Sequence, residues 1–167
     1  MLTTTMTSED RYYAVTASPV GDLLVVGDGE AVTGIGFLGR AAPRPGWRAD
    51  DAPVAAALDQ LAAYFAGERR DFDLPLAPAG TAFQQRVWDA LVAIPYGVTT
   101  TYGELADRIG HAGSARAVGA ANGANPLAIV VPCHRVVGAD GTLTGYAGGL
   151  DAKATLLALE GVTGSRR

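Results

Sequence analysis

The sequence is poor in the residues that form covalent and metal cross-links. Its 167 residues include one cysteine, Cys133, and two histidines. A single cysteine excludes an internal disulfide framework, and this set is too small for the usual tetrahedral zinc site, so we expect neither a metal nor another cofactor. No apolar run is long enough to span a bilayer, and residues 1–10 lack the basic and apolar regions of a secretory signal. We therefore expect a cytoplasmic protein with no membrane contact and a disordered start at residues 1–10.

What the sequence does contain is enough apolar material for a core. Hydrophobic residues make up 49% of the chain, which suits one or two compact domains. Short β-prone runs at residues 12–17, 23–26 and 32–37 are separated by glycine and proline, which indicates antiparallel strands. Residues 53–66 place apolar side chains on one helical stripe, and residues 72–76 favour one more strand. This first part holds no recognisable group of titratable residues, so we expect it to be a structural domain.

The second part follows a linker with proline and glycine at residues 76–80 and is predicted to be mainly helical. Thr81 and Gln84 form a capping-box pattern ahead of an amphipathic helix. Two further helices, at residues 102–109 and 114–122, are joined by a turn that contains glycine, which is typical of a helix-turn-helix. The later helix is rich in alanine and glycine, so few of its side chains can read base edges, and it favours recognition of DNA by shape.

The last part is predicted to be a wing and a final helix. Asp140 and Gly141 are a strong hairpin-turn signal within residues 136–149, and Asp151 begins the last helix. Together with the three preceding helices, this pattern predicts a winged helix-turn-helix. Glu160 lies at the end of the last helix.

Cys133 lies near the end of an apolar run, residues 125–136, which we expect to be a buried extended segment. His134 and Arg135 follow it directly. The thiolate is the competent nucleophile, and a cysteine with an ordinary pKa near ~8.5 needs a base or a positive charge to react at neutral pH. A lone buried cysteine is most often a small apolar core residue. The residue types alone therefore leave a structural and a nucleophilic Cys133 open.

The residues around Cys133 also carry a resemblance to a known family. The match is a consecutive run with ordered flanks: Pro132, Cys133, His134, Arg135 and Val136, with Asn125 and Pro126 upstream and Gly145, Tyr146, Gly148, Gly149 and Leu150 downstream. It is similar to the active-site signature of the O6-alkylguanine-DNA alkyltransferases, also called methylated-DNA-protein-cysteine methyltransferases, and the similarity runs from about residue 80 to residue 161. The resemblance implies an α/β (α+β) fold. A small N-terminal antiparallel-sheet domain of ribonuclease-H-like type (residues 1–79) would precede a C-terminal winged helix-turn-helix domain (residues 80–167).

The same resemblance implies DNA repair by direct damage reversal. The alkyl group of O6-alkylguanine, and of O4-alkylthymine, would pass irreversibly to Cys133 after base flipping, once per chain, as in a suicide enzyme. The implied partner is double-stranded DNA that contains alkylated guanine, bound by a monomer that can act cooperatively. The net charge of −4 arises in the first part, since residues up to 79 hold eleven acids and six bases, whereas the remainder holds six acids and seven bases. A nearly neutral second part predicts modest, salt-sensitive affinity for DNA.

The family's functional residues map onto matching positions of this chain. By the resemblance, Cys133 accepts the alkyl group, His134 acts as a base through a water, and Glu160 orients the imidazole. Asn125 would tie the helix-turn-helix to the cysteine segment, and Tyr102 would donate a proton to the guanine. The implied base pocket consists of Tyr146, Val136, Ala147, Gly148 and Lys153, of which the lysine stabilises the developing oxyanion. The implied DNA surface consists of Arg116, Tyr102, Thr101, Ser114, Ala115, Asn122, Gly123 and Arg135, of which Arg116 enters the stack where the nucleotide has been flipped out.

Other interpretations remain open at this point. Without the resemblance, the residue types of Tyr102, Glu160 and Lys153 favour structural roles for all three. A cysteine hydrolase would also use Cys133 and His134, but it would turn over repeatedly and ignore DNA. A non-catalytic module that binds alkylated DNA would keep the helix-turn-helix without needing the thiol, although relatives of that kind replace the cysteine. The zinc ligands of some relatives have no counterpart here, so the resemblance adds no metal.

Overall fold

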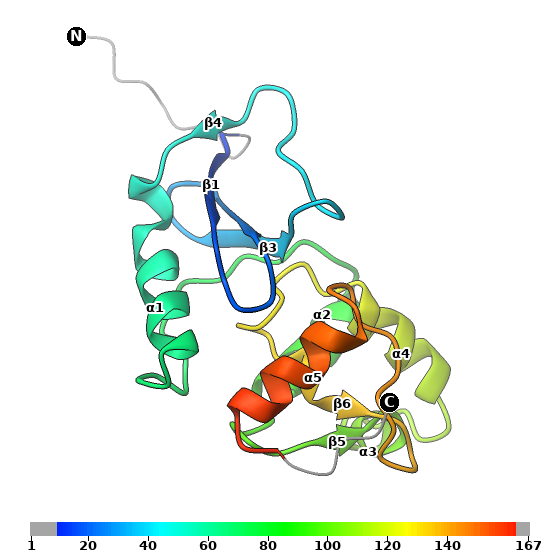
Figure 1. The fold of residues 1–167 in the computed structure, drawn as a ribbon. Helices are drawn as coiled ribbons and strands as arrows, with labels where there is room; N and C mark the ends of the chain where they lie inside the picture. Colours follow the sequence, from blue (N-terminus) through cyan, green and yellow to red (C-terminus); the bar gives the residue numbers. More distant parts are fainter. Residues whose placement is uncertain (1–9, 163–167) are drawn as a thin grey trace, which may run out of the picture. The chain divides into compact units, whose positions relative to one another are not determined.

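The computed structural model describes residues 10–162, and the chain divides between Ala77 and Pro78 into two compact units (Figure 1). The expectation of disorder at residues 1–10 falls, apart from Asp10, outside the described residues. Each unit has its own secondary structure and is described by itself below. Within residues 10–162, no helix combines the length and the apolar character that crossing a membrane requires.

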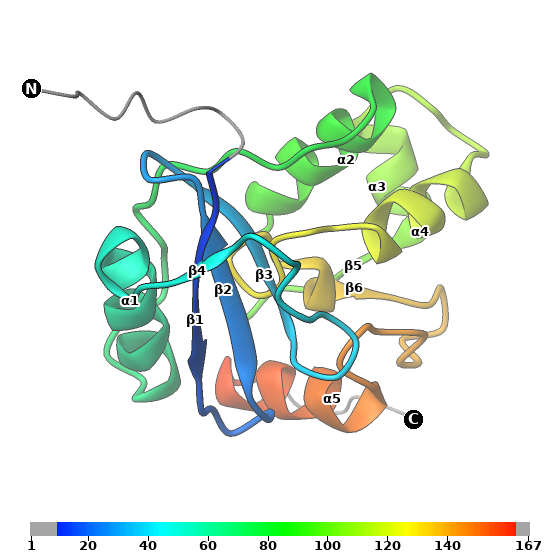
Figure 2. The same cartoon turned by 90° about the horizontal axis from the view of Figure 1, so that it is seen from above.

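The first unit is built on a four-stranded sheet. Strands β1 (Tyr12–Thr16), β2 (Leu23–Gly27) and β3 (Val32–Phe37) pair antiparallel in chain order, which confirms the three predicted strands. A two-residue strand, β4 (Arg48–Ala49), adds to β1 in parallel and gives the order β3-β2-β1-β4 (Figure 2). All five residues of β2, an inner strand of the sheet, are buried.

Helix α1 (Ala55–Phe65) follows a short 3-10 turn, η1 (Ala52–Val54), and lies beside the sheet of this unit in both views (Figures 1 and 2). It buries the residues that repeat at helical spacing: Ala57, Leu61 and Tyr64. The strand predicted at residues 72–76 is wrong. Only Leu76 pairs, in one isolated bridge to Val32. Proline at position 75 has no N–H to donate to a ladder, so the pairing does not extend.

The second unit contains three helices that pack together: α2 (Ala82–Val92), α3 (Tyr102–Arg108) and α4 (Ala115–Gly123) (Figure 2). The predicted capping box is present, because Thr81 Oγ1 accepts from the Gln84 N–H and the Gln84 side chain accepts from the Thr81 N–H. These two bonds satisfy backbone donors that a helix start would otherwise leave unpaired.

The apolar run before Cys133 is buried, as predicted, but it is not extended. The Val131 N–H donates to the Leu127 carbonyl at 2.9 Å, which closes a turn. Ile129 lies within this turn with φ of +73°, in the left-handed region that β-branched residues rarely adopt. Hydrophobicity predicted the burial, but an apolar run carries no periodicity that would distinguish a turn from a strand.

The chain then enters the 3-10 helix η2 (Cys133–Arg135) and strand β6 (Val136–Val137). Strand β6 pairs in parallel with β5 (Thr100–Thr101), which directly precedes α3. This pairing holds the cysteine segment next to the start of the helix-turn-helix.

The predicted wing is a loop rather than a hairpin. The turn at Asp140 and Gly141 forms, with the Gly138 N–H donating to the Thr142 carbonyl at 2.9 Å. The next named element in the described chain, however, is helix α5 (Leu150–Leu159), and the sheet that contains β6 has β5 as its other strand. Glu160 is the C-cap residue of α5, and α5 packs against η2.

Candidate active site

The cysteine of the site begins the short helix η2. Cys133 is 6% exposed, and burial raises the pKa of its thiol because a low-dielectric environment disfavours the thiolate. A hydrogen bond from the Asn125 side chain and the positive charge of Lys153 act in the opposite direction. Burial is the largest of these effects, so the thiol stays protonated near neutral pH until a base takes its proton.

The neighbouring residue is a fully buried histidine that contacts a carboxylate. His134 Nε2 lies 2.7 Å from Glu160 Oε2. Burial lowers the pKa of His134 and outweighs the hydrogen bond and charge of Glu160, which raise it. A neutral His134 that carries its proton on Nε2, facing the carboxylate, keeps Nδ1 as a proton acceptor. Among residues 10–162, this Nδ1 atom has no hydrogen-bond partner.

Arg135 lies in the interior and not on the DNA-facing surface that the resemblance implies. It is 5% exposed and pairs with Glu160 in a bidentate arrangement, through Nε to Oε1 at 2.8 Å and Nη2 to Oε2 at 3.1 Å. Its Nη1 donates to the Ile94 carbonyl at 2.6 Å, and its guanidinium carbon lies 5.8 Å from the centre of the Tyr96 ring. The expected DNA contact is therefore replaced by a buried ion pair.

A tight loop between α2 and β5 completes the environment of Glu160. The Gly97 N–H donates to Glu160 Oε1 at 3.3 Å, and the Tyr96 hydroxyl donates to the Leu159 carbonyl at 3.1 Å. Gly97 has φ of +77°, and a Cβ added there would lie 2.9 Å from the Glu160 carbonyl oxygen, so this position requires glycine. Sequence reasoning missed this role, since a proline and a glycine at 95 and 97 indicate only the end of a helix.

Asn125 fixes the turn that leads from α4 into Cys133. Its Nδ2 donates to the Val131 carbonyl at 2.8 Å, and its Oδ1 accepts from the Leu127 N–H at 2.9 Å. These bonds hold both ends of the turn and place the amide beside the thiol.

Thr144 connects two residues that the resemblance assigns to the reaction. The buried Lys153 donates from Nζ to the Thr144 carbonyl at 2.9 Å, while the Tyr102 hydroxyl lies 2.8 Å from Thr144 Oγ1. Burial lowers the pKa of Lys153 to about 8, and the charge of Cys133 acts to raise it. Thr144 carries no sequence signal of its own, because its contacts depend on how the loop before α5 folds.

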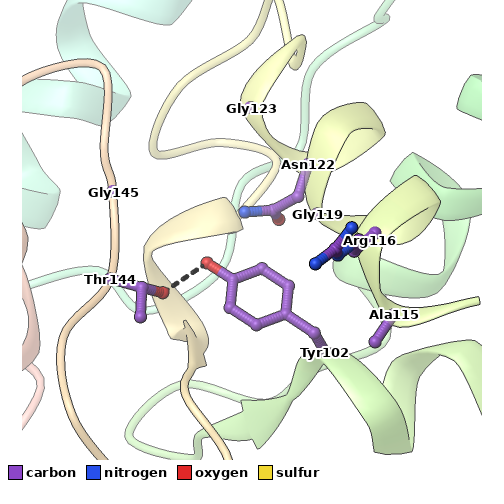
Figure 3. A pocket seen from close by; sticks show the side chains of 8 residues that line it. All are labelled: Tyr102, Ala115, Arg116, Gly119, Asn122, Gly123, Thr144 and Gly145. Atoms are coloured by element: carbon purple, nitrogen blue, oxygen red, sulfur yellow. Dashed lines mark hydrogen bonds between the residues drawn. The ribbon is translucent and has the colours of Figure 1, made fainter.

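A cavity of about 470 Å³ opens between α3, α4 and this loop (Figure 3). Its volume falls in the range of small-molecule sites. The lining residues are Tyr102, Ala115, Arg116, Gly119, Asn122, Gly123, Thr144 and Gly145. Small residues of α4 leave the space open, and Arg116 is exposed. Five of these residues belong to the implied DNA surface, whereas Gly119, Thr144 and Gly145 do not.

The other residues that the resemblance assigns to DNA binding or to the base pocket are placed as follows. Thr101 is the N-cap of α3 and forms a capping box with Glu104, whereas Ser114, the N-cap of α4, makes no capping bond through its side chain. Val136 is fully buried in β6. Three consecutive residues, Tyr146, Ala147 and Gly148, follow the cavity-lining part of the loop before α5. Within residues 10–162, no cluster of histidine, cysteine and acidic residues is suited to hold a metal ion.

Both units match models of one protein family. Residues 11–78 match the ribonuclease-like domain of 6-O-methylguanine DNA methyltransferase, and residues 82–162 match its DNA-binding domain. The methylated-DNA--protein-cysteine methyltransferase of Mycobacterium tuberculosis H37Rv is 53% identical over 151 residues, which cover 89% of this chain and 92% of the relative. The protein of the same name from Methanosarcina acetivorans is 52% identical, with 90% and 98% covered.

Solved structures of similar proteins have a similar fold. The crystal structure of M. tuberculosis O6-methylguanine methyltransferase superposes with a TM-score of 0.85 at 53% identity and covers 90% of this chain and 92% of that one. The same organism's protein in complex with DNA gives a TM-score of 0.85 at 54% identity, with 89% and 92% covered. The fold is therefore the mixed α/β arrangement of that family, with an N-terminal sheet domain and a C-terminal helical domain. On these matches, which span both of its units, the chain belongs to the 6-O-methylguanine DNA methyltransferase family.

Proposed function

We propose that this chain repairs DNA by transferring the alkyl group of O6-alkylguanine, and of O4-alkylthymine, irreversibly to Cys133. The observation that carries the proposal is a buried thiol directly followed by a neutral histidine whose Nε2 contacts Glu160. It lies in the unit that matches a DNA-binding domain. A close relative bears the name methylated-DNA--protein-cysteine methyltransferase, and its crystal structure in complex with DNA has the same fold.

The damaged base must leave the duplex before a thiolate can approach its alkyl carbon. Helix α4 suits this task, because Ala115, Gly119 and Gly123 allow a close approach to DNA beside the cavity. The exposed Arg116 extends from the same helix and would fill the space that the extruded nucleotide leaves. Thr101 and Ser114, at the starts of α3 and α4, would contact backbone phosphates.

In the transfer step, the Cys133 thiol passes its proton through a water to His134 Nδ1, and Glu160 stabilises the resulting imidazolium. The thiolate then attacks the alkyl carbon. A C–S bond forms, the C–O bond to the base breaks, and the electron pair of that bond remains on the guanine oxygen. The product on the protein is a thioether.

The negative charge that develops on the leaving base needs stabilisation. The ammonium group of Lys153 would supply it, and the Tyr102 hydroxyl would donate a proton to the guanine. The base pocket would be completed by Val136, Tyr146 and the backbone at residues 147 and 148. Asn125 would fix the position of the cysteine segment relative to the helix-turn-helix through its bonds to the backbone of Leu127 and Val131.

The two parts of the chain would divide the work. Residues 80–167 would bind DNA and carry out the transfer, whereas residues 1–79 would be a structural domain. We place the protein in the cytoplasm, where a single free thiol persists in the reduced form. It would act there as a monomer on double-stranded DNA, without a metal or other cofactor.

Intact mass measured after incubation with duplex DNA containing O6-methylguanine tests the proposal. We expect one added methyl group per chain, a stoichiometry that stops at one, and no adduct in Cys133→Ala. No adduct in the wild type, or an adduct that survives Cys133→Ala, would refute it. The Cys133→Ser variant is a matched control, because it keeps the size of the side chain and replaces the thiol with a weaker nucleophile.

Two other functions predict different outcomes of simple assays. Repeated turnover of ester or peptide substrates, without any effect of DNA, would identify a cysteine hydrolase. Tight binding of the damaged duplex with the alkyl group left on the base would identify a non-catalytic recognition module.

A further inference from the structure

One polar atom at the cavity is buried and unused. Asn122 is 5% exposed and lines the cavity from α4, and its Oδ1 has no hydrogen-bond partner among residues 10–162. In Figure 3 its amide projects from α4 toward Tyr102. Leaving a buried acceptor unpaired costs about 1–3 kcal/mol, so such a group calls for an explanation.

A neighbouring carbonyl favours one orientation of this amide. Asn122 Nδ2 lies 3.5 Å from the backbone carbonyl oxygen of Cys133, at the long limit of a hydrogen bond. Rotating the amide by half a turn would place its oxygen against that carbonyl oxygen, which is unfavourable. The acceptor therefore faces away from the Cys133 carbonyl, while the residue stays next to the reactive cysteine.

Resting on the proposed function, we infer that Asn122 determines substrate specificity by accepting a hydrogen bond from the 2-amino group of the extruded O6-alkylguanine. Alkylation of O6 removes the proton from N1, so the 2-amino group holds the only N–H donors of this base. It also lies on the same edge as O6, and that edge must face Cys133 when the alkyl carbon meets the sulfur. The Asn122 oxygen belongs to a side chain next to Cys133 and is therefore near the donor that the substrate offers.

The same acceptor distinguishes between the two alkylated bases. O4-alkylthymine has no N–H group on its ring or substituents, because alkylation of O4 removes the proton from N3. It would leave the Asn122 oxygen unpaired in the complex, and the desolvation penalty would persist. Asn122 would thus favour guanine lesions over thymine lesions through a contact remote from the reacting bond.

The test removes either partner of this hydrogen bond. Single-turnover rate constants for methyl transfer are measured on two duplexes of identical sequence, one with O6-methylguanine and one with O6-methylhypoxanthine, which lacks only the 2-amino group. For the wild type, we expect the second substrate to react about three- to tenfold more slowly, the size of one neutral hydrogen bond. In Asn122→Leu, which keeps the volume and removes the acceptor, this ratio should fall to about one. The preference for O6-methylguanine over O4-methylthymine should narrow in parallel.

The matched control is Gly123→Ala, which alters the cavity lining at a neighbouring position where an added Cβ meets nothing within 4 Å. Whatever its effect on the absolute rates, it should leave the ratio between the two purines as in the wild type. An equal ratio in the wild type and Asn122→Leu would overturn the inference, while transfer to Cys133 would leave the proposed function intact. If Asn122→Leu does not fold, the two-purine comparison in the wild type decides, and equal rates there would also overturn the inference. Failure of the wild type to accept methyl from O6-methylguanine would instead refute the proposed function.

Discussion

The buried pair of Arg135 and Glu160 gives the sharpest stability prediction. Two guanidinium nitrogens contact the two carboxylate oxygens at 2.8 and 3.1 Å, and both residues are 5% exposed. Arg135→Met keeps much of the apolar volume and removes the charge. It would take the guanidinium partner away from a buried carboxylate that also contacts His134 and the Gly97 N–H. Breaking a buried pair in this way costs about 3–5 kcal/mol. This is a large share of the total stability of a typical domain, about 5–15 kcal/mol.

Urea unfolding at pH 7 measures this cost. A lower midpoint concentration of urea with an unchanged m-value reports a loss of folding stability. The double variant Arg135→Met/Glu160→Gln is the matched control, because it also removes the unpaired negative charge. Its loss of stability should be smaller than the sum of the two single losses. A loss below about 1 kcal/mol for Arg135→Met would refute the reasoning, since that is the size expected of a solvent-exposed pair.

Two further predictions concern the same site. Gly97→Ala should cost about 1–2 kcal/mol from its left-handed backbone and should also slow alkyl transfer, because its Cβ would press on the Glu160 carbonyl. Gly67→Ala, with φ of +75° and open space around an added Cβ, should show the backbone cost alone, and equal transfer rates in the two variants would contradict a role of the Gly97–Glu160 contact in transfer. Burial lowers the pKa of Lys153 to about 8, whereas an unfolded lysine titrates at roughly 10.4, so the unfolded chain binds more protons between these values. The wild type should therefore gain stability relative to Lys153→Met from about pH 8 to about pH 10, and parallel curves in a pH series of urea unfolding would refute this.

Local patterns in the sequence predicted the elements whose causes are local. The capping box at Thr81 and Gln84 needs only two residues three positions apart, and it forms as expected. Strand β3 matches its predicted range because a run of β-prone residues and the glycine before it define it. In contrast, the wing depends on whether the chain after the turn pairs back with β6, and the strand that pairs with β6 is β5, 36 residues earlier in the chain. A turn signal at Asp140 and Gly141 carries no information about pairing beyond the turn itself.

The candidate site shows the same limit. The residue types at Cys133 and His134 indicated chemistry, but the place of Arg135 depends on a contact with Glu160, 25 positions away. From the sequence alone, an arginine next to a DNA-binding element is predicted to contact phosphate, because the carboxylate that pairs with it is unknown. Likewise, Gly97 indicates only the end of a helix, whereas the structure shows its N–H in contact with Glu160.

Glu160 contacts both His134 and Arg135, which explains why the site needs the arginine beside the histidine. Glu160 alone would raise the pKa of His134 and favour a protonated ring, which could not accept a proton from Cys133. Burial is the main cause that lowers the pKa of His134, and the positive charge of Arg135 lowers it further, which favours the neutral ring that the proposed base requires. Burial also raises the pKa of the Cys133 thiol, which limits its reaction with other electrophiles. An acceptor that is used only once requires both conditions, because a thiolate present at all times would be lost to other reactions before it met a damaged base.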